Sequence, residues 1–269
     1  MKKIIKILLI ILLIFFLIYY LFNFVYVRFL RKYNFEKSSI TISNNYNNSP
    51  FSISKIIMYS SSYAQNKNNS YAQRNLIFDI MQYTDIAIYI DNNNNNILNE
   101  TNSVKKLYIE NIKISSPKLG SASIYYLDSL NFGTNNVNTD YEISDSLEFT
   151  VLNDSNEQKN IGSNTPVFFT DCSNPITLKY VNWGIKENYT IASNEPIFQN
   201  GKLLEMANIS LNNLETNIDL QIKIESNDNK KYLYKLKLPI NLKNQNATIY
   251  DGSILIKNNY KKLKFMLIE

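Results

Sequence analysis

Hydrophobic and polar side chains alternate with a period of two over much of the chain beyond residue 50. This is the pattern of β-strands that bury one face. The clearest example is Asn217–Glu225, where every second residue is Ile or Leu and the residues between them are polar or charged. A polar stretch at 226–230 follows, and Lys231–Leu238 then alternates again. This pattern predicts a β-hairpin with one buried face. Pro239 cannot donate to a ladder, so we expect it to end that strand or to lie at an edge.

Nine further segments have the composition and length of strands. These are Phe51–Tyr59, Leu76–Asp91, Val104–Ile114, Ala122–Leu127, Leu147–Leu152, Pro166–Phe169, Ile176–Trp183, Ile254–Lys257 and Leu263–Ile268. In the third of them the apolar period slips between Ile109 and Ile112, which predicts a β-bulge. Helical periodicity is weak, and only Lys202–Ala207 is expected to form one or two helical turns.

Many short strands joined by Asn-rich and Ser-rich turns predict an all-β fold of the β-sandwich type. The length allows either one large sandwich or two packed lobes. The best boundary is the polar stretch at 153–164, which has no apolar period. We therefore expect a first β lobe at 51–152 and a second at 163–269.

The N-terminal segment has a different character. Residues 1–6 are short and basic, and Ile7–Val27 is apolar except for Asn23. That stretch is long enough to cross about 30 Å of hydrocarbon as a helix. The residues at its C-terminal end are bulky, and the small residues of a cleavage site are missing there. We therefore expect an uncleaved single-pass transmembrane helix, a signal anchor. Residues 28–50 would form a juxtamembrane stalk.

The basic residues do not decide the orientation of this anchor, because Lys and Arg flank both of its ends in similar numbers. Short basic N-termini followed at once by an anchor usually stay inside the cell. We therefore expect the bulk of the chain, residues 33–269, to lie outside the cell membrane.

Charge is divided unevenly along the chain. Six of the 28 basic residues and none of the 23 acidic residues lie within residues 1–32. The remaining chain therefore carries 22 basic and 23 acidic residues, which is far from the clustered basic surface that nucleic-acid binding needs. Nucleic acid is not an expected partner. Frequent Asn, Ile, Lys and Tyr indicate AT-rich codons and hence a bacterium of low genomic GC content.

Residue types that are missing exclude large classes of enzyme. The chain has no His, one Cys and six Gly. Without His, triads and dyads that use an imidazole base are excluded, as are His-ligated zinc and haem sites. One Cys cannot form an intrachain disulfide, and no glycine-rich phosphate-binding motif occurs.

Two segments superficially match known sites. Residues 91–96 read Asp followed by five Asn and partly fit a calcium loop, but the Gly and the final Glu of that loop are missing. Cys172 follows the apolar residues Val167–Phe169. An anchor, a β-rich domain and a Cys after a strand superficially resemble the sortase transpeptidases, which need a His partner that this chain lacks. We expect a polar turn at 91–96 and a buried or inert thiol at Cys172.

Other polar and aromatic residues give weaker signals. Nine acids are available for paired-carboxylate chemistry, and their spacing distinguishes none of them. These are Asp128, Asp140, Glu142, Asp145, Glu148, Asp171, Glu187, Glu195 and Glu205. Trp183 with Tyr180 and Tyr189, or the pair Tyr125 and Tyr126, could stack on a sugar, although aromatics at strand spacing usually pack in a core.

These observations predict a non-catalytic interaction or structural role at the cell envelope. The partners would be the lipid bilayer, through residues 7–27, and an envelope protein or polysaccharide. No catalytic residue, cofactor or metal ligand is assigned. The alternative is a membrane-tethered hydrolase that uses carboxylates or a Ser/Lys pair. The residues near Met58–Ser62 do not match the Ser-x-Met-x-Pro pattern of the type I signal peptidases.

Overall fold

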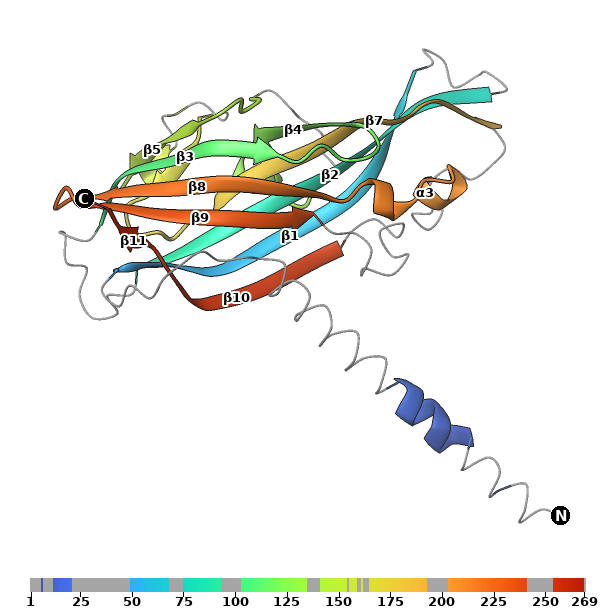
Figure 1. The fold of residues 1–269 in the computed structure, drawn as a ribbon, viewed down its shortest axis with the longest axis horizontal. Coiled ribbons are helices and arrows are strands. Elements are labelled where there is room, and N and C mark those ends of the chain that lie inside the picture. The colour runs from blue at the N-terminus through green and yellow to red at the C-terminus, as the bar shows by residue number, and fades with distance from the viewer. Residues whose placement is uncertain are drawn as a thin grey trace. The chain divides into compact units, whose positions relative to one another are not determined.

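The computed structural model describes residues 6, 12–20, 49–67, 75–92, 103–134, 141–153, 155–158, 161, 165–192, 203–240 and 254–268 (Figure 1). The chain divides into two compact units, Met1–Ser39 and Ile40–Glu269.

In the first unit, residues 12–20 are helical. All of their side chains are aliphatic or aromatic, and each exposes between 50% and 72% of its surface. No helix among the described residues has both the length and the apolar character needed to cross a membrane. Residues 7–11 and 21–27 of the predicted anchor, and residues 28–48 of the predicted stalk, lie outside the described residues. The anchor therefore stays a prediction.

The second unit is mostly β and contains two packed sheets (Figure 1). Sheet A has the strand order β10 (Ile254–Lys264), β1 (Phe51–Asn66), β2 (Asn75–Asn92), β7 (Ile176–Ala192) and β4 (Ser121–Tyr126). Sheet B has the order β11 (Met266–Leu267), β9 (Lys231–Ile240), β8 (Thr216–Ser226), β3 (Val104–Ile114), β5 (Leu147–Leu152) and β6 (Val167–Phe169). The short helices are η2 (Ser129–Asn131), α2 (Ser155–Gln158), α3 (Leu203–Met206) and η4 (Leu211–Asn213).

The alternating pattern forms the hairpin that the sequence predicts. Strands β8 and β9 pair in antiparallel register, and burial alternates along β8 from Thr216 to Ser226. The expected bulge in β3 is also confirmed, because the register shifts between Glu110 and Lys113 and Asn111 has a φ of 55°. Pro239 does not end its strand, since β9 continues to Ile240 and Pro239 pairs with Asn217 of β8. Among the described strands its other side is an edge, as the alternative expectation has it, because β11 pairs only with Tyr232 and Leu233 of β9.

Strands β1 and β7 are longer than their apolar segments. The β1 ladder with β2 continues through polar residues as far as Asn66. One reason is that the hydroxyl of Ser60 and that of Thr84 are 2.7 Å apart in the buried ladder, so each satisfies the other. A strand can therefore extend beyond its apolar segment when the polar side chains in the extension have hydrogen-bond partners.

The sheets pack through aromatic contacts between their facing sides. The rings of Tyr126 in β4 and Phe149 in β5 have centroids 6.2 Å apart. At another edge Phe51 in β1 packs 5.2 Å from Tyr232 in β9. The chain passes from sheet A to sheet B at Phe265, which is fully buried between β10 and β11.

The all-β prediction and the packing of two sheets are confirmed. Each sheet, however, combines strands from before and after residues 153–162. Strand β7, for example, lies between β2 and β4 in sheet A (Figure 1). The sheets therefore do not coincide with the segments 51–152 and 163–269 that the sequence suggests as lobes. The physical reason is pairing between strands that are distant in sequence, which periodicity does not encode.

Two glycines with positive φ give a matched test of this packing. A Cβ on Gly120 (φ 89°) would collide with the side chain of Asn182 and would lie 2.6 Å from the carbonyl oxygen of Trp183. A Cβ on Gly133 (φ 74°) would be no closer than 3.8 Å to the ring of Tyr59. We expect Gly120→Ala to lower the free energy of unfolding by about 2–5 kcal/mol, and Gly133→Ala by about 1–2 kcal/mol.

Urea unfolding followed by the fluorescence of Trp183, the single Trp, measures both changes. Equal losses in the two variants would show that the close approach at Gly120 is not present in solution.

Candidate functional site

The two faces of sheet A have different contents. Because Tyr126 contacts Phe149 of sheet B, its side of sheet A is the inner face. Directly paired residues share a face in an antiparallel ladder. Tyr126 pairs with Leu178 and Leu178 pairs with Ile86, so these are inner residues too. Their chain neighbours at 179 and 85 lie on the opposite side, which we call the outer face.

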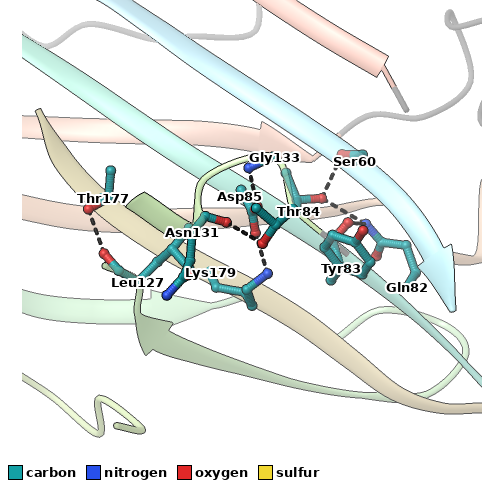
Figure 2. Close-up of polar contacts among 11 residues, drawn as sticks. Ser60, Gln82, Tyr83, Thr84, Asp85, Leu127, Asn131, Gly133, Thr177 and Lys179 are labelled. Atoms are coloured by element: carbon teal, nitrogen blue, oxygen red, sulfur yellow. Dashed lines mark hydrogen bonds and ion pairs between the residues drawn. The ribbon is translucent and has the colours of Figure 1, made fainter. Parts of the chain in front are cut away.

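The outer face holds a buried ion pair at its centre. Asp85 of β2 and Lys179 of β7 are direct register partners. The Lys179 Nζ lies 2.6 Å from Asp85 Oδ1, and both side chains are fully buried. Figure 2 shows the two side chains reaching toward each other from neighbouring strands.

The segment that follows β4 folds over this pair. The backbone N–H of Gly133 donates to Asp85 Oδ2 at 2.9 Å. The hydroxyl of Thr177 donates to the carbonyl oxygen of Leu127 at 2.6 Å, which fixes the start of the same segment (Figure 2). Between these anchors Asp128 caps η2 by accepting from the N–H of Leu130 at 2.9 Å. Each Asp85 oxygen therefore has a partner, one charged and one from the backbone.

Aromatic side chains surround the pair on the outer face. Lys179 Nζ lies 4.5 Å from the centroid of the Tyr83 ring, within the range of a cation–π contact. Tyr83 belongs to a buried hydrophobic cluster, against which two half-buried aromatic rings pack. The cluster comprises Met81, Tyr83, Tyr125 and Val181, with Tyr59 and Trp183 packed against it. The pair therefore lies in surroundings of low dielectric constant, where charges are poorly solvated.

Burial shifts the ionisation of these groups. It raises the pKa of the Asp85 carboxyl, while the Lys179 ammonium and the Gly133 N–H act in the opposite direction. Burial also raises the pKa of Tyr83 to about 12, and Tyr59 and Asp85 add to this rise. The surroundings thus favour the protonated, neutral forms of Tyr83 and Asp85, and the Lys179 ammonium and the Gly133 N–H oppose this for Asp85.

The inner face behind the pair carries hydrogen-bonded polar groups. Gln82 Nε2 donates to Thr84 Oγ1 at 2.7 Å, and Ser60 shares the same hydroxyl (Figure 2). All three side chains are buried. They face the space between the sheets, whereas Asp85 and Lys179 face away from it.

The residues that the sequence marked as candidates do not converge. Residues 93–102 of the partial calcium loop lie outside the described residues, and Asp91 is exposed at the end of β2. The burial expected for Cys172 is confirmed, and it raises the pKa of the thiol to about 12. In the described part of the chain, no three Asp, Glu or Cys side chains gather as a metal site would require.

The candidate acids within the described ranges have separate local roles. Asp128 caps η2, and Asp171 accepts from the N–H of Ser173 at 2.9 Å. The backbone of Glu142 forms an isolated β-bridge with that of Tyr125. Asp140 and Glu195 lie outside the described residues. Among the seven of these acids that the structure describes, no two carboxylates are in contact.

The proposed aromatic platform is not formed as suggested. Tyr180 is fully buried on the inner face, beside the outer-face residue Lys179. Trp183 is half-buried and its Nε1 donates to the Tyr125 hydroxyl at 3.3 Å. Trp183 and Tyr180 therefore lie on opposite faces of the sheet.

Sequence reasoning missed Asp85 and Lys179. The available signal was Lys179, the single charge in the predicted strand Ile176–Trp183, together with an acid in the middle of Leu76–Asp91, a strand that also contains Asp79 and ends at Asp91. A charge in a buried strand needs a partner, and opposite charges on two such strands suggest that the strands are neighbours.

No protein-family model, curated protein or solved structure matches this chain.

Removing one member of the buried pair should be strongly destabilising. Lys179→Met leaves Asp85 buried without its counter-charge, and we expect a loss of about 3–5 kcal/mol in the free energy of unfolding. Lys223→Met is the matched control, because Lys223 Nζ lies 3.6 Å from Glu110 Oε1 and both side chains are about one-third exposed. The control should lose less than about 1 kcal/mol. Chemical denaturation measures both, and similar losses would contradict the importance of burial.

Alkaline pH should unfold the domain through its buried tyrosines. Burial raises the pKa of Tyr83 and of Tyr126 to about 12. The folded state therefore holds these protons more tightly than the unfolded state, whose phenols have the ordinary pKa of about 10. The resulting stability is complete below pH 10 and is lost as the pH rises toward 12.

Circular dichroism against pH measures this transition. Tyr83→Phe removes one ionisable group, so we expect its alkaline midpoint to move upward. The same replacement at the more exposed Tyr63 should leave the midpoint in place. An unchanged midpoint in Tyr83→Phe would contradict the assignment.

Proposed function

We propose that the chain is a membrane-anchored bacterial protein whose β-sandwich has a non-catalytic interaction or structural role at the cell envelope. Residues 7–27 would lie in the bilayer, and the bulk of the chain would lie outside the cell. The observation that carries this proposal is the helix at residues 12–20, whose side chains are all aliphatic or aromatic and at least half exposed.

A helix that is apolar on all sides is stable only when apolar matter surrounds it. Each residue of 12–20 would otherwise leave a large hydrocarbon surface in water, at a cost of about 25 cal/mol per Å². The apolar sequence extends on both sides to Ile7 and Val27, which is the length of a membrane span. The bilayer is therefore the surrounding that fits the segment best.

A non-catalytic role is supported by the character of the polar site. Asp85 and Lys179 are fully buried, and Gly133 covers the second carboxylate oxygen. A catalytic group must reach its substrate, and this pair is closed to one. The lysine also pairs with a carboxylate and not with a serine, which gives no support to a Ser/Lys hydrolase.

Membrane attachment is tested by charged substitutions in the apolar helix. Leu13→Lys combined with Leu17→Lys places two ammonium groups where the proposal requires hydrocarbon. Such charges cost about 2.5–3.5 kcal/mol each at a helix centre. We expect the wild type to resist carbonate extraction from membranes and the double variant to be released. The matched control, Leu13→Ile with Leu17→Ile, should stay in the membrane. Release of the wild type would contradict the anchor.

The side of the membrane is tested by labelling intact cells. Ser116 is exposed after β3, so Ser116→Cys offers an accessible thiol to a membrane-impermeant maleimide. The wild type is the control, because its single thiol at Cys172 is buried. Labelling of the Ser116→Cys variant in intact cells supports a domain on the outer side of the membrane. Labelling only after lysis would place the domain inside and contradict the envelope role.

A further inference from the structure

We propose that Lys179 and Asp85 condense to form an amide bond between their side chains, which joins β2 to β7 covalently. This modification does not depend on the proposed membrane location. It rests on the distance between the two groups, on their isolation from water and on the contacts that hold each of them.

Proximity favours the reaction. Lys179 Nζ and Asp85 Oδ1 are 2.6 Å apart, and the two residues are direct partners in the ladder, so the backbone holds them together. Reacting groups held in contact behave as if their effective concentration were about 10⁵ M or more. The β2–β7 ladder runs on both sides of the pair, from Gln82 opposite Asn182 to Ile88 opposite Ile176.

Burial favours the product over the reactants. Both side chains are fully buried, so bulk water, which drives amide hydrolysis, does not reach them. An ion pair in such surroundings also bears the cost of removing two charges from water. An amide is neutral, so condensation removes this cost.

The proton balance is complete without another reagent. A proton passes from the Lys179 ammonium to the Asp85 carboxylate, which gives a neutral amine and a neutral carboxylic acid. The raised pKa of Asp85 makes this transfer easier. The lone pair of Nζ then attacks Cγ, the Cγ–N bond forms, and the bond from Cγ to Oδ1 breaks. That oxygen leaves as water, carrying the proton that it received and one from the nitrogen.

The groups that surround the pair favour formation of the amide. The Gly133 N–H donates to Oδ2 at 2.9 Å, which stabilises the negative charge that develops on this oxygen in the tetrahedral intermediate. Oδ1 is the oxygen beside the amine and the one that leaves. The Tyr83 ring, 4.5 Å from Nζ, holds the lysine side chain over the outer face.

The test is the mass of the purified full-length protein. We expect a mass lower than that of the sequence by one water molecule. Proteolysis should then yield a branched peptide that contains both Asp85 and Lys179, because trypsin cannot cleave after an acylated lysine. Lys223 and Glu110, whose side chains form a partly exposed pair at 3.6 Å, should appear in separate, unlinked peptides.

Substitutions test whether the missing mass of one water molecule comes from Asp85 and Lys179. Lys179→Arg keeps a positive charge but should restore the full mass. Asp85→Ala removes the carboxyl carbon that Nζ attacks, so this variant should also keep its full mass. In denaturing electrophoresis the wild type should migrate faster than Lys179→Arg, because the bond closes a large loop.

The wild-type mass decides the matter even where a variant fails to fold. A protein of full mass, with free and trypsin-sensitive Lys179, would overturn the proposal. A loss of water that maps to any other residues would overturn it equally.

Discussion

The register of β2 against β7 depends on one contact, the meeting of Asp85 and Lys179 on the outer face of sheet A. A slip of one residue in either strand would turn that strand's charge to the opposite face of the sheet and leave its partner on the outer face alone. A buried charge without its partner costs several kcal/mol, so the observed register is strongly favoured. The same register directs Ile86 and Leu178 toward sheet B. A polar contact on one face therefore positions the apolar core on the other.

The sequence predicts local structure well where burial alternates without interruption. The β8–β9 hairpin and the bulge at Asn111 follow directly from the period of two and its slip. The extension of β1 through Ser60 could not be predicted in this way, because it depends on a hydroxyl partner in another strand. The arrangement of strands in each sheet also depends on distant pairing, which the period does not contain.

The candidate site shows the same division. Acids were plentiful in the sequence, and their spacing gave no reason to choose among them. The informative acid was Asp85, because it is charged in the middle of an apolar strand where solvation is poor. Its partner Lys179 has the same character in β7. Such isolated charges indicate a required contact, although the sequence does not say which strand supplies the partner.

A buried ion pair is weak support for stability, since well-packed apolar residues of similar size often serve as well or better. The presence of Asp85 and Lys179 therefore needs another physical reason. Register specificity is one, because only opposite charges require a single alignment of β2 with β7. Condensation is a second, because the amide keeps the alignment and removes both charges from the dry interior. The two reasons act in sequence: the ion pair would select the register during folding, and the bond would then make that register permanent.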